Sequence, residues 1–272
     1  MKRLKLVVLF FAGILISGNA LALDFRASTN ITIYDQRQGT FQGTTSVVGN
    51  KGLGVGTEDQ EVEPGMVRDQ DWDLEGFFLD GNTLAMVGGF NFLNGVSGYD
   101  YMSGDIFIAT GESPQYGEEA NASITYSGYD YVIDVDWSSV SGGVGSYTVY
   151  ALASDGSSAL GDVLGYNSPE SSPWNLQAIN NGAREGSGSF SFGTTTDSGF
   201  SGGTHYYVDG FDLSFLGADV PFWAHFTMEC GNDNLMGHGT TPVPEPATML
   251  LLGTGLISLA GFGRRKFFRG KN

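Results

Sequence analysis

The sequence predicts an all-β protein whose body is an antiparallel β-sandwich of the jelly-roll kind. Three observations lead to this class. Apolar and polar residues alternate along several short segments, as they do in half-buried strands. Turn-forming Gly, Ser, Asn and Asp separate these segments, and glycine alone accounts for 42 of the 272 residues. Lys, Arg and Glu, which build exposed helix faces, are scarce between residues 23 and 241.

The first element in chain order is a predicted signal peptide in residues 1–22. It has a basic start, "MKRLK", and an apolar stretch, "LVVLFFAGILISG". Ala20 and Ala22 then supply the two small residues of a cleavage site. We expect cleavage after Ala22, so that residues 23–241 form an exported body.

Two hairpins are the clearest elements of the expected body. Residues 72–79 and 83–87 flank an Asp-Gly turn, which tolerates the positive φ angles of a tight hairpin. Residues 129–137, "YDYVIDVDW", alternate strictly, and a glycine-rich loop connects them to a predicted partner at residues 146–152. Further strands are expected at residues 30–36, 104–110, 186–193, 204–208, 211–216 and 222–230, and a short helical turn at residues 173–180.

The last element is an apolar run in residues 247–263, followed by a basic tip in residues 264–271. As a helix, these 17 residues would be roughly 25 Å long, which is enough to span a bilayer core. Arg and Lys residues follow without an acid among them, and such clusters stay on the cytoplasmic side. The sequence therefore predicts a single transmembrane helix with the body outside.

Pro244, Glu245 and Pro246 stand directly before this apolar run, and Arg264 and Arg265 follow it. With these three parts in order, the C-terminal segment resembles the PEP-CTERM sorting signal of exported proteins from Gram-negative bacteria. The resemblance implies a signal over residues 242–272 and a membrane protease, exosortase, that cuts near the Pro-Glu-Pro motif. It also implies a location on the cell surface or in the extracellular matrix, often in bacteria that build exopolysaccharide and biofilm. Several segments of the body are similar to blocks in PEP-CTERM surface proteins of unassigned function. The residues that carry the sorting signal are Val243, Pro244, Glu245, Pro246, Arg264 and Arg265.

Charge narrows the possible partners of the body. Residues 23–241 contain 29 acids and five bases, a formal charge of −24. Nucleic acids and anionic lipid surfaces both require clusters of Lys and Arg, so neither is an expected partner. This charge is compatible with three kinds of partner: divalent cations, neutral or cationic polysaccharides, and other surface proteins.

Calcium is the only cofactor that the sequence suggests, and the suggestion comes from the acidic stretch around residue 72. In an extended strand, alternate acids would project from one face, and clustered carboxylates suit Ca²⁺. The spacing does not fit an EF-hand, and a solvated acidic face is the alternative explanation. A second candidate site combines Asp105 with Asp130, Asp134 and Asp136. The acids of the first candidate site are Asp69, Asp71, Asp73 and Glu75.

Cys230 is the only cysteine, so the chain has no intrachain disulfide. Alternation places it with apolar neighbours and predicts a small buried side chain. A free reactive thiol and a metal ligand are the alternatives. The spacing of His225, Cys230 and His238 lacks the close pairs of structural zinc sites.

No catalytic residue is expected. "GFSGG" matches a nucleophile elbow around Ser201, but a polar loop precedes it and a strand follows, where an elbow needs a strand and then a helix. We therefore expect a non-enzymatic structural or adhesive surface protein. The alternatives are a carbohydrate-binding module and a secreted glycan hydrolase. Aromatic side chains could fill the core or form a sugar-binding platform; they include Trp72, Trp137, Trp174, Tyr206, Tyr207 and Trp223.

Overall fold

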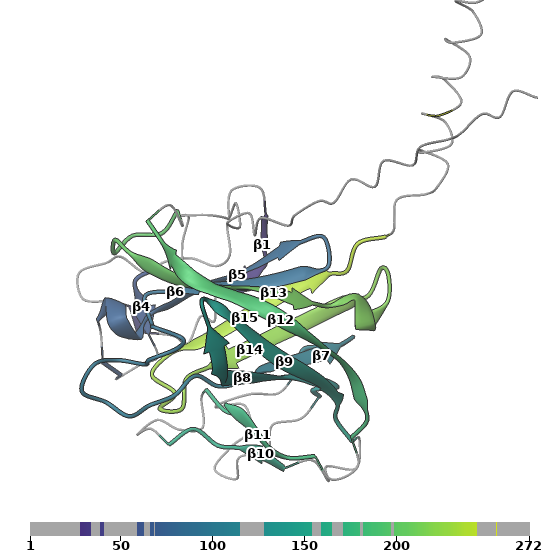
Figure 1. The fold of residues 1–272 in the computed structure, drawn as a ribbon, viewed down its shortest axis with the longest axis horizontal. Helices are drawn as coiled ribbons and strands as arrows, with labels where there is room; N and C mark the ends of the chain where they lie inside the picture. The colour runs from purple at the N-terminus through teal and green to yellow at the C-terminus, as the bar shows by residue number, and fades with distance from the viewer. Residues whose placement is uncertain are drawn as a thin grey trace, which may run out of the picture.

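The computed structural model describes residues 28–33, 39–40, 59–62, 66–67, 69–114, 128–153, 159–164, 171–179, 182–196, 199–243 and 254. Within these ranges the chain is all-β and antiparallel, which confirms the predicted class (Figure 1). One continuous sheet of eleven strands, in place of two separate sheets, carries the core in the order β1-β5-β6-β13-β12-β9-β8-β7-β14-β15-β2. Two small ribbons, β10–β11 and β3–β4, accompany it.

The strands of the main sheet have the following bounds: β1 Thr29–Asn30, β2 Thr32–Ile33, β5 Leu74–Asp80, β6 Thr83–Gly88, β7 Ile106–Thr110, β8 Tyr131–Ser141, β9 Val144–Ala151, β12 Arg184–Thr195, β13 His205–Asp212, β14 Pro221–Thr227 and β15 Asn234–Thr240. The ribbons consist of β3 Gly39–Thr40 with β4 Glu61–Val62, and β10 Ala159–Gly161 with β11 Asn175–Ala178. Two 3₁₀ turns are η1 Gln70–Trp72 and η3 Ser214–Leu216.

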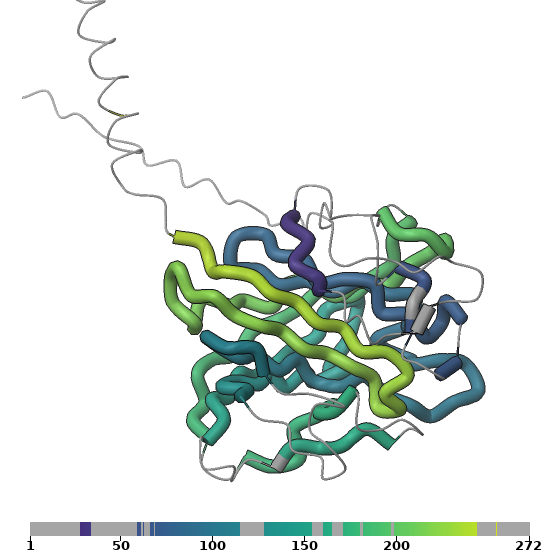
Figure 2. The backbone as a smooth tube through the Cα atoms, turned by 180° about the vertical axis from the view of Figure 1, so that it is seen from behind, coloured from purple at the N-terminus to yellow at the C-terminus, as the bar shows by residue number. Residues whose placement is uncertain are grey.

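Ile31 joins the two ends of the sheet order. β1 pairs with β5 and β2 pairs with β15. Between them, the Ile31 N–H donates to Phe77 O at 3.0 Å, and the Ile31 carbonyl accepts from the N–H of His238 at 2.8 Å. The sheet therefore folds over its own core. β9 and β12 face the viewer in Figure 1, and the β14–β15 hairpin faces the viewer from the opposite side in Figure 2.

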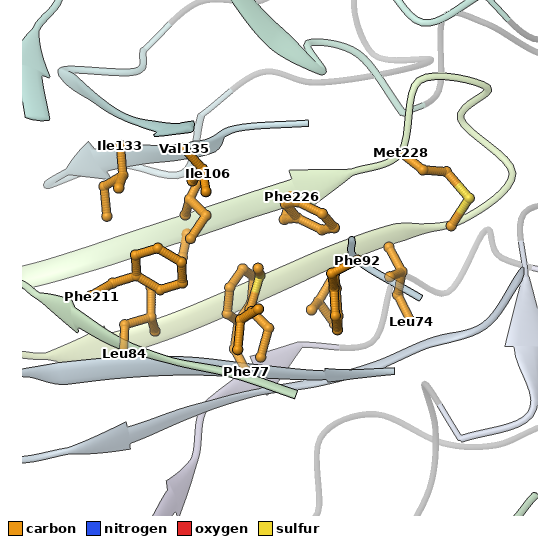
Figure 3. Packing of buried hydrophobic residues seen from close by; sticks show 14 of the residues in the cluster. Leu74, Phe77, Leu84, Phe92, Ile106, Ile133, Val135, Phe211, Phe226 and Met228 are labelled. Carbon is orange, nitrogen blue, oxygen red and sulfur yellow. The ribbon is translucent and has the colours of Figure 1, made fainter. Parts of the chain in front are cut away.

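The core between these layers is rich in aromatic and branched side chains. β8 shows the predicted alternation, because Ile133, Val135 and Trp137 are buried in the core and Asp136 is exposed. The side chains that point toward one another in Figure 3 come from strands and loops far apart in the sequence. They include Leu74, Phe77, Leu84, Phe92, Ile106, Phe211, Phe226 and Met228, each at most 1% exposed.

Both predicted hairpins are confirmed. Asp80 pairs with Thr83 across the first turn, where Gly81 adopts a φ of 57°. β8 pairs antiparallel with β9 in the second. The sequence signals suffice here because turn chemistry and alternation agree.

Two local predictions are wrong, and one strand was not predicted. Residues 175–178 form β11 in place of a helical turn, because the Leu176 N–H is held by Asp105. Residues 211–216 do not form a separate strand, because the Asp212 carboxylate accepts from the N–H and hydroxyl of Ser214 and starts η3. β15 had no sequence prediction, since glycines within it interrupt the apolar pattern.

The predicted signal peptide (1–22) lies outside the described residues, with Ala20 and Ala22. The same holds for Pro244, Glu245 and Pro246, for the basic tip with Arg264 and Arg265, and for the apolar run 247–263 except Thr254. Within the described part of the chain, no helix is long and apolar enough to cross a membrane.

Candidate functional site

The folded body ends at Thr241, directly after β15. Thr241 is buried, and its N–H donates to Val220 O at 3.0 Å. Its hydroxyl oxygen accepts from the Val220 N–H at 2.9 Å, and its carbonyl accepts from the N–H of Asp219 at 3.1 Å. Two residues later Val243 is 62% exposed. The transition from packed strand to exposed chain therefore takes two residues.

A cluster of three buried carboxyl groups lies at the other end of β15. Asp73, Glu75 and Asp233 are at most 1% exposed. One oxygen of Asp233 accepts from the Leu74 N–H at 2.5 Å and the other from the Asn234 N–H at 2.8 Å. Asp233 thereby ties the start of β5 to the start of β15.

The turn η1 brings Asp73 into this cluster. The Trp72 N–H donates to Asp69 O at 2.9 Å and the Asp73 N–H to Gln70 O at 3.2 Å, so the chain turns before β5 begins. Trp72 and Asp73 are buried as a result, while Asp69 and Asp71 are exposed. The extended arrangement expected for the four acids Asp69, Asp71, Asp73 and Glu75 is therefore wrong.

Burial sets the protonation of the cluster. Desolvation raises the pKa of Asp73 and of Glu75 well above the usual range, and repulsion from neighbouring acids adds to both shifts. Desolvation also raises the pKa of Asp233 to about 8. The Asp73 carboxyl hydrogen-bonds to Glu75, which raises the pKa of Asp73 and lowers that of Glu75.

His205 closes the cluster. Desolvation lowers its pKa. Its Nε2 lies 2.9 Å from Glu75 Oε1 and 2.8 Å from the carbonyl oxygen of Ser201. A carbonyl only accepts, so Nε2 carries the proton. Gln70 adds a donor to the same Glu75 oxygen at 2.7 Å.

Ser201 lies beside this cluster but lacks the geometry of a hydrolase nucleophile. Its hydroxyl donates to Asp59 at 3.2 Å, and its N–H donates to the other oxygen of that carboxylate at 3.0 Å. His205 contacts the Ser201 carbonyl and not the hydroxyl. A serine nucleophile needs a base that takes its hydroxyl proton, and His205 is not placed to do so.

No group of three or more His, Cys, Asp or Glu side chains is arranged to hold a metal ion, as far as the described residues extend. Calcium therefore stays a prediction from composition. The second candidate group disperses along the sheet. Asp105 is buried, Asp130 accepts from the Thr110 N–H and hydroxyl, Asp134 is half-buried and Asp136 accepts from Ser138.

Cys230 is a free thiol inside the core cluster, 5% exposed. Desolvation raises its pKa to about 11, so the reactive thiolate is scarce at neutral pH. His225, five residues earlier, is also buried, and its pKa is lowered to about 3 by desolvation. The Tyr129 hydroxyl lies 2.6 Å from its Nδ1.

Most of the candidate aromatic residues do not form a platform. Trp72 and Trp137 are buried in the core. Trp223 stacks on His238 with ring centroids 4.4 Å apart, and Tyr207 packs beside Phe78 on the other face of the sheet. Tyr206 is different, because it is half-buried and lines a cavity of about 350 Å³.

Sequence patterns did not reveal Asp233 or His205 as members of a site. Asp233 stands in "CGNDNLMG", which resembles an ordinary polar turn between strands. Only its contact with Leu74, 159 residues away in the chain, gives it a structural role. The one available signal was the density of Asp and Asn beside an apolar strand.

Comparison with protein-family models identifies residues 242–266 as the PEP-CTERM protein-sorting motif. The match begins one residue after Thr241, where the packed body ends. A search of curated proteins and a search of solved structures found no match. The motif marks the chain as an exported protein that exosortase, a membrane enzyme, sorts to the cell surface.

Proposed function

We propose that this protein is a non-enzymatic structural or adhesive component of the cell surface or biofilm matrix. In this proposal the β body is the cargo and exosortase frees it from its membrane tether. One observation carries the proposal: Thr241 completes the fold, and the sorting motif begins at the next residue. The hydrogen bonds that Thr241 makes with Val220 and Asp219 all lie on the body side of Val243, so a cut beyond Val243 leaves them in place.

The exposed segment suits recognition by a protease. Pro242 and Val243 are exposed and follow a strand end that Val220 and Asp219 hold in place. Proline keeps the backbone extended and excludes a helix, so the chain reaches the enzyme as an open strand.

The arrangement of Asp59, Ser201 and His205 supports the non-enzymatic part of the proposal. The Ser201 hydroxyl donates to the Asp59 carboxylate, and His205 contacts the Ser201 carbonyl in place of the hydroxyl, so the three side chains do not form the serine–histidine pair of a hydrolase. The acids Asp73, Glu75 and Asp233 are buried and engaged in the fold, and glycoside hydrolysis needs carboxyls that reach a substrate.

The test replaces the sorting residues in the native host. We expect the triple variant Pro244→Ala, Glu245→Ala, Pro246→Ala to accumulate uncut in the inner membrane, with less protein at the surface and less biofilm. Glu185→Ala, an exposed acid on β12, is the matched control and should be sorted as the wild type is. Surface delivery of the triple variant at wild-type level would refute the proposal.

A further inference from the structure

The cavity beside Tyr206 lies far from Thr241, the residue at which the packed body ends. β15 runs from Asn234, which follows Asp233 at the cavity end, to Thr240, which precedes Thr241, and its seven residues span roughly 23 Å. Leu74 connects Asp233 to the cavity. Its N–H donates to the Asp233 carboxylate, and Leu74 pairs with Gly88 of β6. Gly88 also pairs with Tyr206. The cavity therefore lies near the start of β15, at the opposite end of this strand from Thr241.

The lining of this cavity combines one aromatic ring with several small polar groups. Tyr206 stacks on Phe192 with ring centroids 6.0 Å apart and an interplanar angle of 8°, so its orientation is set by the sheet. Asp71 adds an exposed carboxylate from η1. The rest of the lining comes from the loop after β6 and consists of Gly89, Asn91, Asn94, Gly95, Val96 and Ser97.

Local hydrogen bonds hold this loop in shape. Asn91 Oδ1 accepts from the N–H groups of Leu93 and Asn94 at 3.1 Å, and the Asn91 carbonyl accepts from the Gly95 N–H at 2.8 Å. The Asn91 amide oxygen is thus engaged within the loop, which leaves the amide NH₂ as its group for a ligand. Asn94 and Ser97 are exposed and carry both donors and acceptors.

We propose that this cavity binds a sugar unit of a neutral polysaccharide. A volume of about 350 Å³ lies within the usual range of small-molecule sites. A tyrosine ring offers a face to the apolar C–H side of a pyranose, and amides, a hydroxyl and a carboxylate match its hydroxyl groups. Among the described residues of the lining none is Lys, Arg or His, and the body's formal charge of −24 repels anionic polysaccharides.

This inference rests on the proposed surface role, because a protein at the cell surface meets polysaccharides. The binding of a sugar does not itself require that exosortase sorts the protein. The adjacent side chain of Tyr99 is 54% exposed and stacks on Tyr101 with ring centroids 6.2 Å apart. It widens the aromatic surface beyond the cavity. If one sugar unit of a polysaccharide fills the cavity, the next unit of the chain would contact the Tyr99 ring.

Native affinity electrophoresis of the full chain in mild detergent tests the inference. The gels contain dextran, galactomannan or xyloglucan as neutral probes, and alginate as the anionic probe. We expect at least one neutral probe to retard the protein and alginate to leave its mobility unchanged. Asn94→Ala should weaken the retarding affinity about three- to tenfold, and Tyr206→Ala should weaken it more.

Two further variants separate binding from folding. Tyr206→Phe keeps the aromatic ring and should keep most of the affinity. A loss of affinity in Tyr206→Ala but not in Tyr206→Phe would then be due to loss of the ring. Tyr150→Ala removes a half-buried tyrosine of β9 outside the cavity lining and should bind as the wild type does. Absence of retardation by every neutral probe, stronger retardation by alginate, or equal affinity of Asn94→Ala, Tyr206→Ala and wild type would overturn the inference. None of these results bears on sorting.

Discussion

Thr241 and Val220 hold each other through hydrogen bonds in both directions. The Thr241 N–H donates to Val220 O at 3.0 Å, and the Val220 N–H donates to the Thr241 hydroxyl oxygen at 2.9 Å. This reciprocal pair closes the last strand against the chain that enters β14. It separates a body that must stay folded from a tail that must stay accessible.

Loss of the Thr241 hydroxyl should destabilise the end of the body. Thr241→Val keeps the side-chain volume but leaves the Val220 N–H without its acceptor, at a cost of about 1–2 kcal/mol. Thermal unfolding followed by circular dichroism measures the change. Thr240→Val, on the exposed neighbour, is the control and should unfold within about 0.5 kcal/mol of wild type. Equal losses of unfolding free energy in Thr241→Val and Thr240→Val would contradict a special role for the Thr241 hydroxyl.

The stability of the body should fall as pH rises from about 4 to 8. Desolvation raises the pKa of Asp105 to about 7 and that of Asp233 to about 8, and the pKa values of Asp73 and Glu75 are also raised. In the unfolded chain these acids titrate near pH 4. The folded state therefore binds more protons in this interval, and raising the pH favours unfolding. Urea unfolding at pH 5 and pH 8 measures the difference.

Asp105→Asn tests the contribution of one of these acids. Its carboxylate accepts from the Val135 N–H at 2.9 Å and from the Leu176 N–H at 2.7 Å, and an amide can accept only one of them. We expect a net loss of about 1–3 kcal/mol at pH 5 and a shallower slope of stability against pH. Asp136→Asn, on the exposed face, should leave the slope unchanged. A wild-type slope in Asp105→Asn would contradict the assignment.

Gly104→Ala should loosen the β10–β11 ribbon from the main sheet. A Cβ at this position would collide with the carbonyl oxygen of Trp174 and lie 2.6 Å from that of Thr227. Backbone atoms cannot move aside cheaply, so we expect a loss of about 1–3 kcal/mol or more. Gly186→Ala is the matched control, because a Cβ there meets nothing within 4 Å. Chemical denaturation of both variants gives the comparison.

Cys230 should resist thiol reagents while the protein is folded. With a thiol pKa of about 11 and 5% exposure, labelling at pH 8 should be roughly a hundredfold slower than in urea. Mass spectrometry after timed exposure to iodoacetamide follows the reaction. Labelling at similar rates in both states would show that the Met228–Asp233 turn opens readily.

Local sequence rules predicted the elements in which propensity and tertiary structure agree. The Asp80–Thr83 hairpin and the alternating β8 followed from turn chemistry and a period of two. β15 escaped prediction because Gly237 and Gly239 replace larger residues where Phe77 and Phe222 approach within 3.0 Å of a Cβ position. The need for glycine at these two positions is explained only by the aromatic ring that packs against each of them.

The buried acids show a second limit of sequence reasoning. An extended chain would have placed Asp71 and Asp73 on one face, but η1 exposes the first and buries the second. The partner that decides this outcome is Asp233, which binds the Leu74 N–H from 159 residues away. Contacts of this range leave no local signal. The sorting motif was predictable because its recognition depends on a contiguous segment.

The mass of the mature protein isolated from its native host tests the central claim most directly. Sorting by exosortase predicts a chain that begins near Leu23 and lacks residues 247–272. A mature species that retains residues 247–272 intact would contradict the claim and make the protein a permanently tethered one.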